Sequence, residues 1–281
     1  MQDVIQKTPQ VNVREVFRNK NPRLAGLLPG FIFRYLEKIV HQEDINNFLE
    51  RHGEKIGLDF VQAVLEEFDI KLSVKGIDNI PGNGRYIFAS NHPLGGFDGL
   101  LLMSVLESRF SGFKVLVNDI LMNIKNLHPL FIPINKHGKQ GLEAARILDE
   151  AYRSDLQILT FPSGLVSRRI KGQIVDLVWK KNFIGKSIQY QRDIVPVFVS
   201  GRNSEFFYRL GRIRRLLGIK ANLEMFYLVD ETFKHRHKSI SIIFGDPIGY
   251  HTFDKSRSSL EWARWVKEKV YALNGINSIP V

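Results

Sequence analysis

The sequence predicts an α/β fold, a mixed and mostly parallel sheet covered by helices, with a helical N-terminal extension. From residue 71 onward, apolar runs of strand length alternate with longer stretches of helical periodicity, which is typical of a sheet with helices on its faces. Two of these runs, within residues 156–162 and 194–201, are almost continuously apolar, as expected for strands buried on both faces. We expect an extension over residues 1–70 and a main domain over residues 71–281.

The individual elements follow from the same patterns, in chain order. Residues 1–20 are polar and predict an irregular lead-in, whereas apolar periodicity predicts helices within residues 22–52 and over residues 59–69. A strand then runs into a turn that contains Gly76 and Pro81. Further strands are expected at 85–90, 113–118, 130–135, 156–162, 194–201 and 239–248. Further helices are expected at 97–110, 139–154, 202–220 and 258–273.

Composition limits the function classes. The chain has 281 residues, of which 44% are hydrophobic and 25% charged, so it can bury a sizeable core and does not resemble a disordered chain. It contains no cysteine, which excludes disulfides, thiolate metal sites and cysteine nucleophiles. The formal net charge of +11 favours an acidic partner: nucleic acid, an anionic membrane leaflet or an acidic protein. The alternative is a basic surface that is simply solvated.

Membrane contact is expected to be peripheral. No apolar stretch reaches the roughly 18 residues that a spanning helix needs. The first residues also lack the apolar centre of a signal peptide. We therefore expect the protein to remain in the cytoplasm, where it can meet a membrane only at its surface.

The first candidate for catalysis follows the strand at 85–90. Ligands of open α/β sheets bind beyond the carboxyl ends of the strands, so polar residues at these points are the ones to inspect. His92 lies there, and Asp98 follows across a loop that contains Gly95 and Gly96. A carboxylate can accept one ring N–H of a histidine and leave the other nitrogen to act as a general base. The alternative is a structural histidine in a turn, with Asp98 capping the next helix.

Three further strand ends carry polar or unusual residues. One apolar run ends in a Pro-Ser-Gly turn, after which Arg168 and Arg169 offer positive charge to an anion. Another ends in Asn135, which is followed by Lys136. A third contains Pro196, which favours an edge or bulged strand.

Taken in order, these segments resemble the motifs of the glycerolipid acyltransferase superfamily, whose best-known members acylate glycerol-3-phosphate or lysophosphatidic acid. The Asn-His…Asp motif is similar to Asn91, His92 and Asp98. The other family motifs are Ile-Pro-Val-Asp-Arg, Phe-Pro-Glu-Gly-Thr-Arg-Ser, Val-Pro-Val and a late Gly-x-Pro-Ile strand. They are similar, in this order, to residues 132–136, 161–167, 195–197 and 244–248. The resemblance covers residues from roughly 72 to 250 and implies an acyltransferase domain over residues 71–281.

The resemblance also implies roles for individual residues. His92 is expected to take the proton of an acceptor hydroxyl while Asp98 orients it, and backbone N–H groups near Gly164 or a neighbouring cation are expected to hold the oxyanion. The co-substrate is an acyl thioester of acyl carrier protein or coenzyme A, with no bound cofactor and no metal. Substrate contacts are expected from Asn91, Asn135, Lys136, Ser163, Gly164, Ser167, Arg168 and Arg169.

Two departures from the family pattern bear on the acceptor. Five residues rather than four separate His92 from Asp98, so the loop must bulge, as Gly95 and Gly96 permit. Val166 replaces the arginine that the family associates with the acceptor phosphate, and the usual glutamate is also replaced. A valine makes no charge-assisted contact, so the sequence favours an acceptor other than a glycerol phosphate, unless a nearby cation substitutes. The candidates are Arg168, Arg169 and Lys136.

The motif variants are similar to a bacterial branch labelled hemolysin-like, close to acyltransferases that build ornithine or glycine lipids. Such acceptors carry a hydroxyl and a carboxylate but no phosphate. The expected function is therefore transfer of a fatty acyl chain to the hydroxyl of a lyso-lipid, with an amino-acid lipid as the favoured acceptor. A lysophosphatidic acid acyltransferase is the alternative within the family. A non-catalytic basic protein that binds lipid or nucleic acid is the alternative from another class, although no nucleic-acid motif is present.

Residues 202–220 interleave apolar and arginine side chains, which is typical of a helix that lies in a membrane interface. A helix that covers the sheet, with its arginines in water, is the alternative, and the same choice applies to residues 22–52. The expected location is the cytoplasmic side of the inner membrane. The His-Arg-His group at 235–237 is interpreted as a solvated basic loop. Membrane contacts are expected from Phe206, Phe207, Arg212, Arg214 and Arg215.

Overall fold

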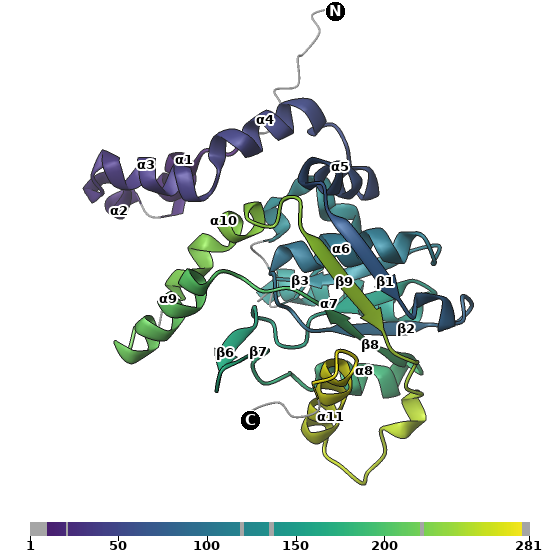
Figure 1. Ribbon diagram of the computed structural model, residues 1–281. Helices are drawn as coiled ribbons and strands as arrows, with labels where there is room; N and C mark the ends of the chain where they lie inside the picture. The colour runs from purple at the N-terminus through teal and green to yellow at the C-terminus, as the bar shows by residue number, and fades with distance from the viewer. Residues whose placement is uncertain (1–9, 21, 119–120, 135–137, 220–221, 277–281) are drawn as a thin grey trace, which may run out of the picture.

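The larger strands form one seven-stranded sheet in the order β1-β9-β8-β2-β5-β3-β4. The computed structural model describes residues 10–20, 22–118, 121–134, 138–219 and 222–276 (Figure 1). Every neighbouring pair in this sheet is parallel except β8 with β9, which confirms the predicted mixed, mostly parallel sheet. Its strands are β1 Lys71–Lys75, β2 Tyr86–Ser90, β3 Phe113–Val117, β4 Phe131–Pro133, β5 Gln157–Thr160, β8 Asp193–Val199 and β9 Ser239–Phe244.

Helices cover both faces of the sheet (Figure 1). α5 and α6 pack on one face, and α7, α8 and α11 pack on the other. Alternate residues of β2 enter different clusters: Phe88 packs on the α6 side, and Ile87 and Ala89 pack on the α11 side. This two-sided burial is why the runs are continuously apolar. The helices are α5 Leu58–Phe68, α6 Gly96–Glu107, α7 Gly138–Arg153, α8 Asn182–Tyr190 and α11 Ser259–Ala272.

Pro196 lies at a bulge inside the sheet and not at an edge, because β8 is bordered by β2 and β9. Val197 pairs with Phe244, and the next bridge joins Ile194 to Ile248, so the two β8 residues between these pairs face three in the partner segment. One extra partner residue therefore sits opposite Pro196. The Pro196 carbonyl accepts the N–H of Gly245 at 2.9 Å, and the missing proline N–H falls where the regular ladder is already broken.

The described N-terminal residues form helices from residue 13 onward. The expectation of an irregular lead-in over residues 1–20 is therefore wrong for α1, Val13–Lys20. Val13 is buried, and Arg14 Nε lies 2.7 Å from the Glu37 carboxylate of α3, so a polar sequence still forms a helix with one packed stripe. The other N-terminal helices are α2 Pro22–Leu27, α3 Gly30–Ile39 and α4 Gln42–His52.

Two helical arms project from the same side of the sheet domain (Figure 1). One arm contains α1, α2 and α3, and the other contains α9 and the segment that follows it. The hydroxyl groups of Tyr35 in α3 and Tyr227 lie 2.7 Å apart, so the arms touch. No helix in the described ranges has both the length and the apolar character that crossing a membrane requires. The second arm consists of α9 Glu205–Leu216, the 3-10 helix η4 Leu223–Tyr227 and α10 Leu228–Phe233.

Three further elements were not predicted from the sequence. β6 Arg168–Ile170 and β7 Gln173–Val175 form an antiparallel hairpin, and α8 follows it. The two residues between the strands, Lys171 and Gly172, both have positive φ, as a tight hairpin turn requires. Arg169, Gln173 and Ile174 of the hairpin line a cavity together with Asn91 and Ser167.

Candidate active site

The carboxyl ends of three adjacent strands define the site. β2 lies between β8 and β5 and is parallel to both, so the segments that leave these three strands emerge at the same edge of the sheet. The segment after β2 carries His92, and the segment after β5 carries Phe161. Their rings stack, with centroids 4.2 Å apart and planes inclined at 28°. Two of the predicted motifs are thus in direct contact.

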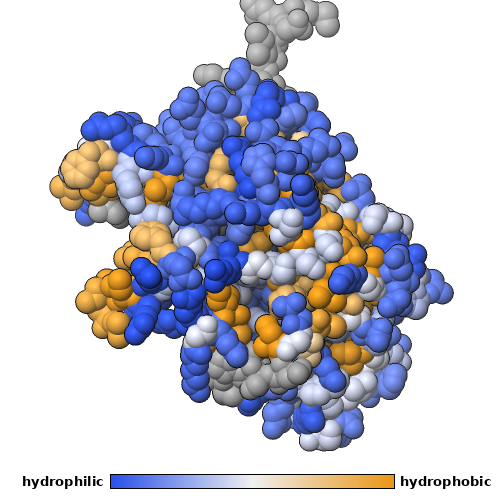
Figure 2. All heavy atoms as spheres, viewed as in Figure 1, coloured by the Kyte–Doolittle hydropathy of each residue, from blue (hydrophilic) through white to orange (hydrophobic). Residues whose placement is uncertain are grey.

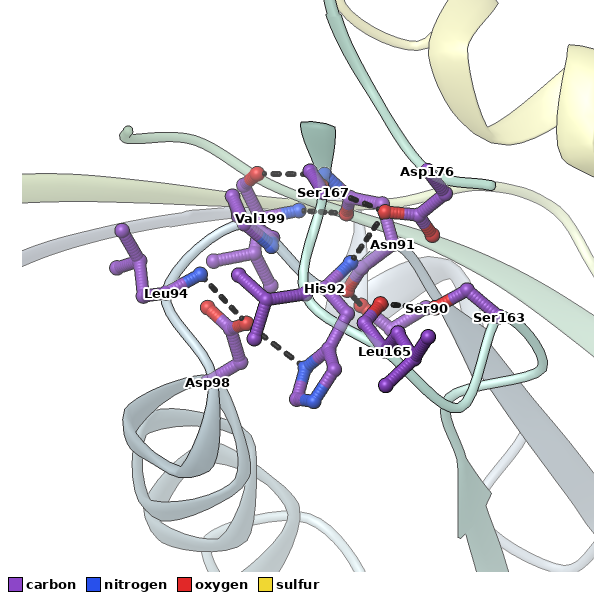
Figure 3. Close-up of polar contacts among 12 residues, drawn as sticks. Ser90, Asn91, His92, Leu94, Asp98, Ser163, Leu165, Ser167, Asp176 and Val199 are labelled. Carbon is purple, nitrogen blue, oxygen red and sulfur yellow. Dashed lines mark hydrogen bonds and ion pairs between the residues drawn. The ribbon is translucent and has the colours of Figure 1, made fainter. Parts of the chain in front are cut away.

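His92 and Asp98 form the pair that the sequence predicts (Figure 3). The Nδ1 atom of His92 lies 3.0 Å from Oδ2 of Asp98, and the N–H of Leu94 donates to the same oxygen at 2.9 Å. Gly95 has φ of 77°, and α6 begins directly after it, which lets the five-residue loop fold back onto the first helical turn. Because Oδ2 already accepts a backbone N–H, the proton shared with His92 belongs on Nδ1. Nε2 is then the basic nitrogen.

The electrostatics of the pair favour proton abstraction. Asp98 is fully buried, and its Oδ1 has no hydrogen-bond partner in the described part of the chain. Burial raises the pKa of the Asp98 carboxyl, and the hydrogen bonds from His92 and the Leu94 N–H oppose this rise. The carboxylate is therefore stabilised further when the neighbouring imidazole gains a proton and a positive charge. The side chain of His92 remains 16% exposed, so a substrate can reach the ring.

Asn91 fixes the start of the loop that carries His92. Its amide nitrogen donates to the Val199 carbonyl at 2.9 Å, and its Oδ1 accepts the Val199 N–H at 2.7 Å (Figure 3). These two bonds join the ends of β2 and β8. An amide supplies both a donor and an acceptor, which explains why this position carries asparagine.

Asp176 is a site residue that the sequence did not reveal. It is buried after β7, and its Oδ1 accepts the His92 N–H at 3.1 Å and the Ser167 hydroxyl at 2.6 Å. Its Oδ2 accepts the indole N–H of Trp179 at 2.9 Å. The Ser167 N–H in turn donates to the His92 carbonyl at 2.8 Å, so both peptide groups of His92 are held. A single aspartate after a short apolar run gives no sequence signal of this role.

The Pro-Ser-Gly turn is held by its own hydrogen bonds. The Ser163 hydroxyl donates to the Leu165 carbonyl at 2.7 Å, and the Gly164 N–H donates to the Phe161 carbonyl at 2.9 Å. The Gly164 N–H is therefore already used and does not serve the expected oxyanion role. Gly164 itself is exposed and has φ of 64°, a conformation that favours glycine.

The two arginines of the predicted site are committed to internal ion pairs. Arg168 is buried, with its guanidinium 3.1 Å from Glu224 and 2.7 Å from the Val166 carbonyl. Arg169 makes two bonds of 2.6 Å with the Glu205 carboxylate. Arg168 is therefore not free to receive a substrate anion, whereas Arg169 is one-third exposed and its Nε has no partner among the described residues. Asn135 and Lys136 lie outside the described residues.

Part of the predicted membrane surface is buried, which corrects two of its residues. Phe207 is fully buried in a cluster with Val166 and Tyr208, so it cannot contact lipid. The side chain of Arg214 is only 10% exposed and lies 2.9 Å from Glu224, so it balances a buried carboxylate. Phe206, Arg212 and Arg215 are exposed on the second arm.

The His-Arg-His segment is also less solvated than expected. His235 is half-buried, its Nε2 has no partner among the described residues, and burial lowers the pKa of its ring. Arg236 lies over the ring of Phe233 at 4.8 Å. Within the described ranges, no group of three or more acidic or histidine side chains is placed to hold a metal ion.

These groups define a class of protein. A histidine with one nitrogen held by a buried carboxylate, at the carboxyl ends of parallel strands, can activate a hydroxyl of the substrate. The sheet and site therefore describe an enzyme of group transfer in which the substrate supplies the nucleophile.

Comparison with known proteins specifies the class. A family model described as Acyltransferase matches residues 15–279, so the chain belongs to this acyltransferase family and to the glycerolipid acyltransferase superfamily that its motifs predict. It is 50% identical over 264 residues to a lyso-glycine lipid O-acyltransferase of Bacteroides thetaiotaomicron, covering 94% of this chain and 97% of that protein. It is 45% identical to a protein of the same name from Phocaeicola vulgatus, with 94% and 95% covered.

Among solved structures, the chain is similar to the 1-acyl-sn-glycerophosphate (LPA) acyltransferase PlsC from Thermotoga maritima. The sequence identity is 15%, the TM-score is 0.47, and the match covers 89% of this chain and 95% of that chain.

Proposed function

We propose that this acyltransferase moves a fatty acyl chain from an acyl thioester to the hydroxyl of a lyso-glycine lipid. The name of both relatives supports this acceptor, since each is called a lyso-glycine lipid O-acyltransferase. The single structural observation that carries the proposal is Val166. It replaces the arginine that the family associates with an acceptor phosphate, and it is 1% exposed against Phe207. An acceptor phosphate would find no cation at this position.

In the proposed reaction, the acceptor hydroxyl donates its proton to Nε2 of His92 as its oxygen attacks the thioester carbonyl carbon. The tetrahedral oxyanion then collapses, the carbon–sulfur bond breaks, and the imidazolium returns the proton to the departing thiolate. Asp98 stabilises the imidazolium between these two steps. General base catalysis of this kind contributes about 10²–10⁴-fold in rate. The thiol that leaves belongs to acyl carrier protein or coenzyme A.

The two arms are proposed to place the enzyme on the cytoplasmic face of the inner membrane. Figure 2 shows apolar side chains gathered at the ends of both arms, beside hydrophilic ones. Apolar anchors next to arginines are what an anionic membrane surface attracts. The exposed apolar side chains are Leu27, Phe31 and Tyr35 on the first arm, and Phe206, Ile213, Leu216, Leu217 and Phe226 on the second.

A strain comparison tests the proposed function. Lipid extracts are analysed by mass spectrometry from cells that lack this protein and from the same cells carrying either the wild-type chain or His92→Ala. We expect lyso-glycine lipid to accumulate without the protein, and only the wild-type chain to restore the diacylated lipid. Accumulation of lysophosphatidic acid instead would favour the alternative acceptor. The same lipid profile in cells with and without the protein would contradict the proposal.

A further inference from the structure

A lyso-glycine lipid presents a carboxylate as well as a hydroxyl, so its binding site needs a positive charge. Of the arginines that follow the Pro-Ser-Gly turn, Arg168 is buried against Glu224, and Arg169 already shares its charge with Glu205. A cation at the same turn that has no carboxylate partner is therefore the better candidate.

Lys180 lies over the same turn from the other side. Its backbone N–H donates to the Pro162 carbonyl at 3.0 Å, which fixes the residue to the segment after β5. Its Nζ lies 3.3 Å from the position that a Cβ on Gly164 would occupy. The side chain is exposed, and it makes no ion pair with any carboxylate of the described residues. The amine is therefore available to a ligand.

His92 and Trp179, the residue before Lys180, are held by the same buried carboxylate. Asp176 accepts the His92 N–H through Oδ1 and the indole N–H of Trp179 through Oδ2. Trp179 is 1% exposed, so this end of the segment is fixed within the core. The stacking of Phe161 on His92 adds a second connection, because Phe161 begins the turn that Lys180 covers. The contacts of Asp176 and Phe161 thus fix the backbone of both His92 and Lys180 relative to the same turn.

We propose that Lys180 binds the carboxylate of the acceptor and thereby determines acceptor specificity. This inference rests on the proposed function. The lysine amine forms an ion pair with the carboxylate, and the hydroxyl a few bonds away is presented to Nε2 of His92. The absence of a bulky side chain at Gly164 leaves the space in which the amine lies. Lys180 then supplies the positive charge that the family's motif supplies from an arginine at the position of Val166. Lys180 lies outside that motif, in the segment before α8.

The test uses the purified full-length protein and two acceptors, an N-(3-hydroxyacyl)glycine and its methyl ester. For Lys180→Gln we expect KM for the acid to rise about tenfold, a modest value for a charge-assisted contact because the amine is exposed. We expect kcat to change less than about twofold, since the contact is equally strong before and during the reaction. KM for the methyl ester should be the same in wild type and variant. Lys180→Arg should restore binding of the acid.

Lys181→Gln is the matched control, because this neighbouring lysine is also exposed and loses the same charge. It should leave KM for both acceptors unchanged. The inference is overturned if Lys180→Gln behaves like Lys181→Gln. It is also overturned if Lys180→Gln lowers kcat equally for acid and ester, which would make the amine an oxyanion contact. The acceptor preference of the wild-type protein is measured first. If it acylates lysophosphatidic acid but not the glycine lipid, the proposed function itself fails.

Discussion

His92 is restrained at its ring and at its backbone. Asp98 holds Nδ1, Phe161 covers one face of the ring, and Asp176 binds the backbone N–H. Sequence patterns identified Asp98 as a partner and placed Phe161 in a second motif, because both residues follow strand ends. They missed Asp176, which lies 84 positions from His92 and is placed by the hairpin that the sequence did not predict. A local pattern shows the order of residue types along the chain. It does not show that the carboxylate of a distant residue such as Asp176 binds the loop that carries His92.

Asp176→Asn tests this restraint. The amide can keep one oxygen on the His92 N–H, but its NH₂ group then faces the indole N–H of Trp179, which is also a donor. We expect a loss of about 1–3 kcal/mol in unfolding free energy, because a buried donor is left unpaired. We also expect kcat to fall, since the His92 loop loosens. Urea unfolding and steady-state kinetics measure the two effects.

The double variant Asp176→Asn with Trp179→Phe shows whether Asp176 acts through its hydrogen bond with Trp179 or whether the substitution destabilises the protein unspecifically. Phenylalanine removes the opposing donor, so the two changes should cost less together than the sum of the single changes. Strict additivity would show that Asp176 does not act through this contact.

At the scale of elements, the second arm is fastened to the β6–β7 hairpin by a buried charge cluster. Glu224 of η4 is fully buried between Arg168 of β6 and Arg214 of α9. Cations around one buried carboxylate offset its desolvation, and removing one would leave an unpaired charge. The sequence predicted Arg168 as a substrate contact and Arg214 as a membrane contact, because it does not show that both face Glu224, which lies 56 positions from Arg168. The pattern of apolar and basic residues predicted the helix correctly but not which face is buried.

Phe206 and Phe207 provide a direct comparison of the two faces of α9. Phe207 is fully buried and Phe206 is 48% exposed. Phe207→Ala should lower the unfolding free energy by about 3–5 kcal/mol, because it leaves a cavity in the cluster that holds Val166. Phe206→Ala should change it by less than about 0.5 kcal/mol. Equal effects in urea unfolding would contradict the orientation of the helix.

At the scale of the whole molecule, the chain order of the seven sheet strands was predictable, whereas the β6–β7 hairpin, α8 and the placement of the arms were not. Two-sided burial makes the central strands visible as apolar runs, so β2, β5 and β8 were located within a few residues. The arms are amphipathic helices, and such a pattern does not state whether its apolar stripe meets the core or another surface. The hydroxyl contact between Tyr35 and Tyr227 joins the two arms.

The arms predict a defined membrane contact. Changing Leu216 and Leu217 together to Glu should abolish co-sedimentation with vesicles that contain anionic lipid, because both side chains are more than two-thirds exposed, at 75% and 68%. Leu260→Glu is the control, because Leu260 is 50% exposed on α11, outside the arms. It should bind vesicles as the wild type does. Equal vesicle binding by the wild type, the double variant and Leu260→Glu would contradict a role of the arms in membrane binding.

The proposed reaction is tested most directly by acyl transfer with the purified protein, with acyl thioester as donor and lyso-glycine lipid or lysophosphatidic acid as acceptor. We expect a higher kcat/KM for lyso-glycine lipid. We also expect His92→Ala to lower kcat by about 10²–10⁴-fold while its melting temperature stays close to that of the wild type. Full activity of folded His92→Ala, or a preference for lysophosphatidic acid, would contradict the proposed reaction.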